Sequence, residues 1–396
     1  MARGSSRRPR VPSGDHASQS EAVHSINTDA AEAAHAAAEG RRGGKTALVL
    51  GGGAPNFTLM AGALLAFHRA NVKFDLISMA GGGAVLGLTY LAPKGDITSE
   101  EALLNTPNIG VSDIIYAAMP INYKVFNKPG HDAEVFRHWF SANPAVRPWL
   151  NQHGMTNAQK LYSDQLQMLG AIMCPSNLNI YSKGMCAHAP FIQELVDFNK
   201  LAASPIDCVV NAYCIEDQAV VEFEKSELDI HAFRASLSFP FIYPPYRFKG
   251  KHYYEGAAYQ ALNFRDAAAR RGIDRIIIFN VMTTQLIRRP RNLWDAYGQS
   301  IILPLVANAQ NELAMIEHWQ THGHAVANGP ATSHLQMTSS GQRWHRPEIY
   351  QLHFDIPAEH REFSLDWTRS NLEYLFELGY RQGRSFVQEH ERLTGA

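Results

Sequence analysis

The sequence predicts an α/β fold in which helices cover both faces of a mainly parallel central sheet. Two short apolar runs, 46–50 and 74–78, lead into glycine clusters at Gly51–Gly53 and Gly81–Gly83, and a helical pattern follows each cluster. Continuous apolar runs of this length are typical of strands buried on both faces, and strands that alternate with helices form parallel βαβ units. Ligands bind such sheets at the carboxyl ends of the strands, where both glycine clusters fall.

Composition places the chain among folded globular proteins. Of its 396 residues, 45% are hydrophobic and 18% are charged, far from the composition of disordered chains. The 36 basic and 37 acidic side chains give a net charge of -1, which argues against a nucleic-acid binder, because such proteins carry a basic surface. No apolar run reaches the roughly 18 residues of a membrane span, and the first residues lack the apolar core of a secretory signal. We therefore expect a cytoplasmic protein without a transmembrane segment.

The cysteines support the same location. Cys174, Cys186, Cys208 and Cys214 are too few and too irregularly spaced for a disulfide scaffold or a zinc finger. Cys208 and Cys214 share one predicted strand, in which the chain between them spans about 20 Å, too far for a disulfide. We expect all four to be reduced thiols.

Three regions follow from the pattern along the chain. Residues 1–44 are rich in alanine, serine, glycine and arginine and are expected to form a disordered tail. Residues 45–390 are expected to form one domain, and 391–396 its C-terminal end. Within the domain, 96–205 has a looser pattern with amphipathic helical stretches such as 133–140. We expect this region to be a helical insertion that forms the wall or lid of a pocket.

The rest of the domain carries further signals of strands and helices. Segments 207–215 and 219–223 are expected to form a hairpin, and 275–281 another buried strand. Residues 327–347 are expected to form a mobile loop. The last helix presents one apolar stripe, composed of Leu372, Leu375, Phe376 and Gly379.

Three elements are candidates for chemistry, and the first is the turn Gly51–Ala54. Successive glycines after a strand let backbone N–H groups converge, and the following helix adds its positive N-terminal end. Such a turn suits a phosphate, a carboxylate or the oxyanion of acyl transfer. The nucleotide-binding patterns are absent, because Asn56 stands where glycine is needed and no Gly-Lys-Ser/Thr ending follows. A plain strand-to-helix corner is the structural alternative.

The second and third elements lie later in the chain. The corner around Gly81–Gly83 is where a nucleophile elbow, Gly-x-Ser-x-Gly, would expose a serine on a sharp bend. The third element is Glu255, a carboxylate next to a glycine just after a strand. Its structural alternatives are that it caps a turn or pairs with one of three nearby cations, Arg247, Lys249 and Lys251.

In this order and spacing the three elements resemble the patatin-like phospholipase family. That family pairs a Gly-Gly-Gly-x-x-Gly oxyanion turn with a Gly-x-Ser-x-Gly elbow and has a much later Asp-Gly-Gly or Asp-Gly-Ala motif. Gly51–Ala54 with the helix that contains Gly62 resembles the first motif, and 235–248 resembles the stretch before the aspartate. The resemblance spans 45–390. It implies a patatin-like fold and lipid acyl hydrolysis by a serine–aspartate dyad, without a metal or another cofactor.

The catalytic positions depart from the family pattern. Alignment of the elbow puts Gly81 at the position of the serine and Met79 at that of the first glycine, where we expect the methionine to crowd the bend. Glu255 replaces the dyad aspartate, and Pro55 and Asn56 replace the usual basic residue and glycine. Glycine has no side chain, so no acyl-enzyme can form at residue 81.

We therefore expect a lipid- or acyl-binding pseudoenzyme of this family. Ser78 cannot replace the nucleophile, because it lies within the strand, before the bend. The expected partner is a lipid or acyl small molecule, with no nucleic acid and with no more than transient contact with a membrane surface. Besides Glu255 and Gly81, the residues expected to hold this ligand are Gly51, Gly52, Gly53, Ala54, Gly82 and Gly83.

Two alternatives stay open. In the first, an active acyl hydrolase or acyltransferase uses Glu255 as a general base over the turn Gly51–Ala54. One general base contributes about 10² to 10⁴ in rate, whereas loss of the nucleophile in triad enzymes costs about 10⁶, so the carboxylate offsets only part of the loss. In the second, the fold is a scaffold without a ligand.

A histidine cluster is the remaining motif. In the segment that contains His318, His322 and His324, two imidazoles stand at the i, i+4 spacing of metal ligands on a helix. The acid that metalloproteases carry between them is absent, and the chain has 18 histidines, so chance pairs are common. We expect no metal site.

Overall fold

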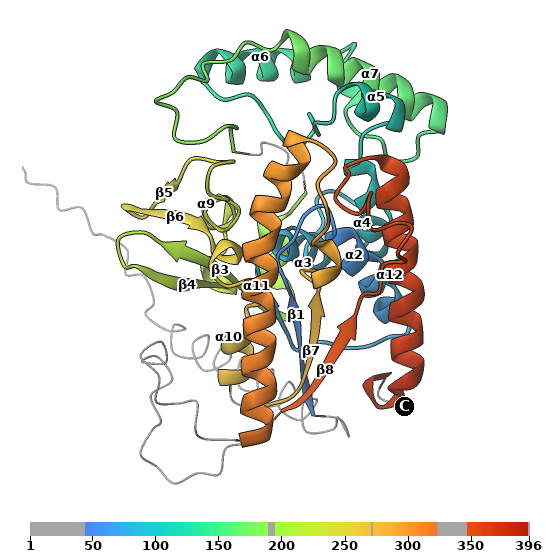
Figure 1. The fold of residues 1–396 in the computed structure, drawn as a ribbon, viewed down its shortest axis with the longest axis vertical. Coiled ribbons are helices and arrows are strands. Elements are labelled where there is room, and N and C mark those ends of the chain that lie inside the picture. The colour runs from blue at the N-terminus through green and yellow to red at the C-terminus, as the bar shows by residue number, and fades with distance from the viewer. Residues whose placement is uncertain (1–43, 189–194, 271, 323–346, 395–396) are drawn as a thin grey trace, which may run out of the picture. The chain divides into compact units, whose positions relative to one another are not determined.

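The computed structural model describes residues 44–188, 195–270, 272–322 and 347–394. Within these ranges, eight strands form one sheet in the order β5-β6-β3-β2-β1-β7-β8, with β4 paired to β3 (Figure 1). The strands are β1 (Lys45–Leu50), β2 (Leu76–Met79), β3 (Asp207–Cys214), β4 (Ala219–Glu224), β5 (Tyr246–Phe248), β6 (Lys251–Glu255), β7 (Ile273–Asn280) and β8 (Glu348–His353). The tail expected over 1–44 and the loop expected over 327–347 lie almost entirely outside the described residues.

The centre of the sheet is parallel, and one side is antiparallel. Strand β1 pairs in parallel with β2 and β7, and these pair in parallel with β3 and β8. Strands β4 and β6 pair with β3, and β5 with β6, in antiparallel fashion. The α/β class is confirmed. The expected hairpin is present as β3 and β4, and the strand expected before the Glu255–Gly256 pair is β6, whereas β5 and β8 were not among the expected strands.

Helices cover both faces of the sheet. Successive side chains of a strand point to opposite faces, so alternate residues of β1 show which helices lie on each face. Ala47 and Val49 of β1 pack in one cluster with α10 (Phe264–Ala269) and with Leu313 of α11 (Leu293–His322). Leu48 and Leu50 pack in the other cluster, with α2 (Phe57–Arg69), α3 (Gly82–Leu91) and α12 (Arg369–Glu389). Figure 1 shows α11 and α12 on the two sides of β7 and β8.

Helices α2 and α12 cross with their backbones in contact. A Cβ atom at Gly62 of α2 would overlap the Phe376 carbonyl oxygen, and one at Gly379 of α12 would overlap the Leu59 carbonyl oxygen. The apolar stripe expected for the last helix faces this contact, and Leu372 and Leu375 are fully buried. Glycine is therefore required in both helices for their close approach.

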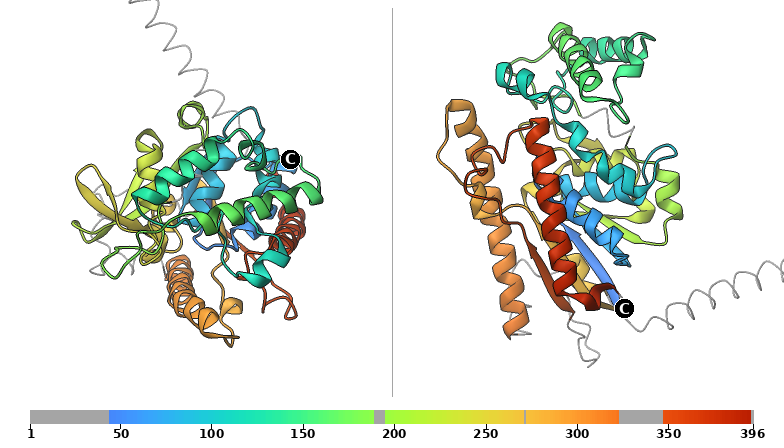
Figure 2. Two further views of the ribbon diagram at one scale, coloured as in Figure 1. Left: turned by 90° about the horizontal axis from the view of Figure 1, so that it is seen from above. Right: turned by 90° about the vertical axis from the view of Figure 1, so that its right-hand side faces the viewer.

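The region 96–205 is largely helical. Helix α4 (Ser99–Leu104) packs against α2 and α3. Figures 1 and 2 show two later helices, α6 and α7, beyond the carboxyl ends of β7 and β8. We call residues 105–188 the lid. The remaining helices of this region and of the next are α5 (Asp113–Ala118), α6 (His131–Ala142), α7 (Asn157–Met173), α8 (Phe198–Ala203) and α9 (Ile230–Ser236). Among the described helices, none combines the length and the apolar character needed to cross a membrane.

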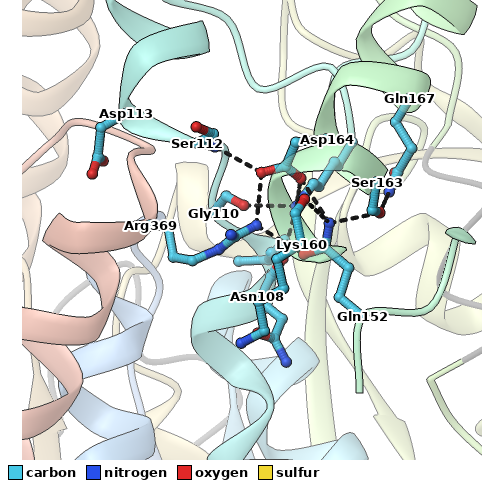
Figure 3. A network of polar contacts seen from close by, with 12 residues as sticks. Asn108, Gly110, Ser112, Asp113, Gln152, Lys160, Ser163, Asp164, Gln167 and Arg369 are labelled. Atoms are coloured by element: carbon cyan, nitrogen blue, oxygen red, sulfur yellow. Dashed lines mark hydrogen bonds and ion pairs between the residues drawn. The ribbon is translucent and has the colours of Figure 1, made fainter. Parts of the chain in front are cut away.

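A buried charge cluster joins the lid to α12 (Figure 3). Asp164 of α7 is fully buried and accepts hydrogen bonds from the Ser112 N–H at 2.9 Å and from Gln152 Nε2 at 2.7 Å. Its carboxylate also forms ion pairs with Lys124 at 2.8 Å and with Arg369, the first residue of α12, at 2.7 Å. Burial lowers the pKa of Lys124 to about 8 even though the charge of Asp164 opposes the shift. One buried carboxylate, shared by two cations, thus joins α7 to α12.

Candidate functional site

Strand pairing brings Glu255 next to the second glycine turn. Strands β2 and β6 both pair with β3, one after the other: Met79 at the end of β2 pairs with Val210, and Glu255 at the end of β6 pairs with Ala212. Glu255 therefore lies just beyond the carboxyl end of β2, beside the turn that contains Gly81.

The carboxyl group of Glu255 fills the space in which a side chain at residue 81 would lie. Gly81 has φ 47° and ψ -119°, a conformation that side-chain-bearing residues rarely adopt. A Cβ atom built there would overlap Glu255 Oε1 and would lie 3.1 Å from Glu255 Cδ and 2.9 Å from Ala257 Cβ. The bend thus has the strand-to-helix form of a nucleophile elbow, with a carboxyl group from another segment in place of the side chain.

The two glycine turns contact each other and the segment after Glu255. A Cβ atom at Gly82 would lie 3.1 Å from the Gly53 carbonyl oxygen, and one at Gly52 would lie 2.5 Å from Ala257 Cβ. All three elements predicted from the sequence therefore meet at one place. We call this contact region, made of 51–54, 81–83 and 255–257, the cradle.

Only some backbone amides of the cradle are without an acceptor. The Gly51 N–H donates to the Phe279 carbonyl at 3.1 Å, and the Gly52 N–H donates to the Ala261 carbonyl at 2.9 Å. These two amides hold the turn in place, so they do not face a ligand. Within the two glycine turns of the described structure, the amides without an acceptor are those of Gly53, Ala54, Gly81 and Gly82. The sequence could not distinguish the two sets, because the acceptors come from distant segments.

Both structural alternatives for Glu255 are wrong. Its side chain forms no capping hydrogen bond to the 3₁₀ turn Gly256–Ala258 that follows it. Within the described ranges it has no ion pair: Lys249 pairs with Glu227 at 3.2 Å and Lys251 pairs with Asp217 at 2.6 Å. Both lysines are thus paired with carboxylates other than Glu255.

Burial without a counter-charge shifts the protonation of Glu255. Its backbone N–H donates to the Ser238 carbonyl at 3.0 Å, which fixes the end of β6. Its side chain is enclosed by protein apart from the part that faces the cavity described below, and this desolvation raises its pKa to about 8. At pH 7 most molecules therefore carry a neutral carboxyl group beside the vacant position at Gly81.

The prediction that Met79 crowds the bend is wrong. A Cβ atom at Gly87 of α3 would overlap Met79 Sδ, so the methionine side chain packs against α3 and away from residue 81. Ser78, by contrast, is fully buried, and its hydroxyl donates to the Asn263 carbonyl at 2.6 Å. Neither side chain reaches the cradle.

A large cavity extends from the cradle to the lid. Its volume is about 2470 Å³, which exceeds the roughly 300–1,000 Å³ of pockets for drug-sized ligands. Glu255 and Gly82 line one part of it, and apolar side chains such as Phe140 of α6 and Leu305 of α11 line others. The arrangement suits an elongated apolar ligand with a polar group at the cradle.

The histidine motif can be followed only in part. His318 lies exposed near the end of α11, whereas the His322 side chain and His324 are outside the described residues. In the described part of the chain, no group of three or more histidine, cysteine, aspartate or glutamate side chains is placed to hold a metal ion.

Sequence reasoning missed several polar residues near the cradle. Glu312 of α11 is buried and accepts a hydrogen bond from the Leu262 N–H at 2.7 Å, next to the carbonyl that holds Gly52. Arg234 of α9 and His188 line the cavity. Their one signal in the sequence was the position of Arg234, directly before the stretch 235–248 that resembles the family. A sequence does not show whether such a cation has an ionic partner in the fold.

Comparison with known proteins assigns the family. A search of curated proteins found no match. Among solved structures, the crystal structure of VipD from Legionella pneumophila is similar at 13% sequence identity and a TM-score of 0.32, over 88% of this chain and 67% of that chain. The family model for patatin-like phospholipase matches residues 48–268, which is more than half of the chain and includes every cradle residue. The chain therefore belongs to the patatin-like phospholipase family.

Proposed function

We propose that this protein binds a lipid or acyl ligand in the cavity and has lost the serine–aspartate hydrolysis of its family. The observation that carries the proposal is the relationship between Gly81 and Glu255. Residue 81 has no side chain to form an acyl-enzyme, and the Glu255 carboxyl group occupies the space of the missing nucleophile. Loss of the nucleophile in triad enzymes costs about 10⁶ in rate, so a binding role is the simpler use of the site.

The cradle offers complementary groups to the polar end of an acyl ligand. The amides of Gly53, Ala54 and Gly82 are donors for a carbonyl or carboxylate oxygen, and Gly82 also begins α3, where the helix dipole favours negative charge. A protonated Glu255 both donates and accepts a hydrogen bond. The apolar walls would then hold the acyl chain.

An active hydrolase is the second candidate, and the same carboxyl group is its support. Glu255 lies beside the amides that would stabilise an oxyanion, so its ionised form could activate water. However, a pKa of about 8 leaves little of the carboxylate at neutral pH. This reading requires turnover that rises as pH passes through 8 and that disappears in Glu255→Gln.

Binding and turnover measured on one protein sample test the proposal. We expect a monoacylglycerol to raise the melting temperature and to bind in calorimetry, since a ligand of the native state stabilises it, while p-nitrophenyl decanoate is not hydrolysed. Leu305→Trp, which fills part of the cavity, should weaken binding. Leu303→Trp on the same helix is the matched control, because Leu303 is exposed and does not line the cavity. Hydrolysis that depends on Glu255, or equal binding by both variants, would contradict the proposal.

We also propose that the lid makes transient contact with a membrane surface. The support is a group of exposed apolar side chains on α6, α7 and the segment after α7: Val135, Trp139, Ile172, Met173, Ile180 and Tyr181. The first four lie on α6 and α7, which also line the cavity, and the last two follow α7 in the chain, so contact with lipid would occur beside the cavity wall. Phosphatidylcholine vesicles should cosediment with wild type and less with Ile180→Asp/Tyr181→Asp, whereas Leu303→Asp, at an exposed position of α11, should behave as wild type. Equal cosedimentation of all three would argue against this surface.

The cytoplasmic location is the last part of the proposal. Its support is that all four cysteines are unpaired thiols, as expected in a reducing compartment. Cell fractionation of the full chain tests it, and recovery in a secreted fraction would contradict it.

A further inference from the structure

The wall of the cavity contains an arginine without a counter-charge. Arg234 of α9 is partly buried, lines the cavity and, in the described part of the chain, has no ion pair and no acceptor for its buried Nε. Two other cations of the cavity wall are paired with carboxylates: Lys124 with Asp164 at 2.8 Å, and Arg291 with Asp366 at 2.8 Å. Among the described residues, Arg234 thus lacks the carboxylate partner that these two cations have.

A histidine beside Arg234 also has an unused ring atom. The ring of His188 stacks on Tyr243, with ring centroids 5.5 Å apart, and contacts the edge of Tyr246 at 4.9 Å. Its Nε2 atom is buried and has no partner in the described ranges. Burial lowers the pKa of His188 to about 4 and the charge of Arg234 adds to this, so the ring is neutral near pH 7. Its other polar contact is with the backbone of Pro244, which can only accept, so Nε2 is left as an acceptor.

Unpartnered polar groups in a cavity wall are costly unless a ligand pairs with them. A buried guanidinium N–H without an acceptor loses hydration that nothing replaces. The planar fork of arginine matches the two oxygens of a carboxylate or phosphate, and such charge-assisted hydrogen bonds are stronger than neutral ones. We infer that Arg234 and His188 form an anion subsite that holds the carboxylate or phosphate headgroup of an amphiphile whose apolar chain occupies the cavity. This inference rests on the proposed lipid-binding function and narrows its ligand to anionic amphiphiles.

Arg234 and His188 would bind different parts of the headgroup, because they differ in charge and in hydrogen-bonding capacity. Arg234 supplies the positive charge and donates to the oxyanion, whereas neutral His188 accepts from a hydroxyl or protonated oxygen of the headgroup. The subsite is connected to the cradle through the end of α9: Ser238 follows the helix, four residues after Arg234, and its carbonyl accepts the Glu255 N–H at 3.0 Å. The subsite and the cradle are therefore two polar positions in one cavity, and the ligand need not carry its charge at Glu255.

Matched probes of one chain length test the subsite in the full chain. Calorimetry compares two anionic probes, decyl phosphate and decanoate, with uncharged decanol, and so measures the preference for an anion. The comparison of decyl phosphate with decanoate distinguishes a phosphate site from a carboxylate site. We expect wild type to bind at least one anionic probe about tenfold more tightly than decanol. Arg234→Gln should bring the two affinities within about twofold of each other. Arg234→Lys, which keeps the charge, should retain a preference, and Arg247→Gln, an exposed arginine of β5 outside the cavity, should match wild type.

The outcomes separate this inference from the function on which it rests. Equal binding of decanol and both anionic probes by wild type overturns the subsite and leaves lipid binding intact. An unchanged preference in a folded Arg234→Gln, checked by its melting curve, also overturns it. Absence of binding by every probe overturns the proposed lipid-binding function itself.

Discussion

Glu255 Oε1 lies where the Cβ atom of any residue other than glycine would stand at position 81. The two residues are 174 positions apart in sequence and meet because β2 and β6 pair one after the other with β3. A family that places a serine at this bend needs that space for its nucleophile. In this chain the Glu255 side chain fills the space left by the missing Cβ at residue 81, so glutamate at 255 and glycine at 81 fit together.

The first prediction concerns this complementarity. Gly81→Ala should destabilise the protein, because φ 47° costs a side-chain-bearing residue about 1–2 kcal/mol and because the new Cβ displaces the Glu255 carboxyl group. A Glu255→Ala background removes the displacement of the carboxyl group and leaves the backbone cost and the 2.9 Å contact with Ala257 Cβ, so the two substitutions should couple favourably. Urea unfolding of the wild type, both single variants and the double variant measures the coupling. Strict additivity would mean that the two side chains do not compete for space.

The second prediction concerns recovery of activity. Gly81→Ser alone should not hydrolyse p-nitrophenyl esters well, since its hydroxyl would stand against the Glu255 carboxyl group and two of the four amides of the glycine turn are already engaged. The double variant with Glu255→Asp, shorter by one methylene, should be the more active of the two. Robust hydrolysis by the single variant would show that the overlap at residue 81 is easily relieved.

The third prediction concerns pH. The pKa of Glu255 is about 8 in the folded protein against an ordinary value of 4.5, so the folded state holds more protons than the unfolded state between these values. The contribution of Glu255 to stability therefore falls as pH rises from about 4.5 to 8, with a slope of at most about 1.4 kcal/mol per pH unit. Glu255→Gln removes this slope. The difference in unfolding free energy between wild type and variant should change with pH across this window.

Two features make this measurement specific. Burial also raises the pKa of Glu312 to about 8, so only the difference between wild type and the Glu255 variant isolates one group. Glu362→Gln removes the same charge from an exposed position and controls for net charge. A constant difference between wild type and Glu255→Gln from pH 5 to 8 would contradict the burial of an uncompensated carboxyl group.

The fourth prediction concerns the attachment of the lid. Asp164→Asn leaves Lys124 and Arg369 buried without their shared counter-charge, which should cost about 3–5 kcal/mol. Hydrogen exchange should accelerate first in α7. Glu100→Gln breaks the exposed pair with Arg69 and should cost no more than about 1 kcal/mol. Similar losses in the two variants would show that the buried cluster does not hold the lid.

The regular centre of the fold was predictable because its strands are continuously apolar and end at glycines. The runs 46–50 and 74–78 correspond to β1 (Lys45–Leu50) and β2 (Leu76–Met79). Strand β8 (Glu348–His353) was missed, because most of its side chains are partly exposed and it has no uninterrupted apolar run. Short strands at a sheet edge depend on partners that a local pattern does not reveal.

The residues of the candidate site could be predicted from the sequence, but the contacts between them could be predicted only in part. Spacing and resemblance named the two glycine turns and Glu255, and these do meet. Which amides are engaged, where Met79 points and whether Arg234 is paired depend on contacts between distant segments. Such contacts leave no mark in the local sequence.

The central claim is that no nucleophile of the family type operates at the cradle. Intact-mass spectrometry of the purified full chain after incubation with a fluorophosphonate, at a concentration that fully labels an active serine hydrolase, tests this claim most directly. The account predicts an unchanged mass, because residue 81 is glycine and the Ser78 hydroxyl is buried in a hydrogen bond. A stoichiometric phosphonyl adduct that is lost with hydrolytic activity in a serine variant would contradict it.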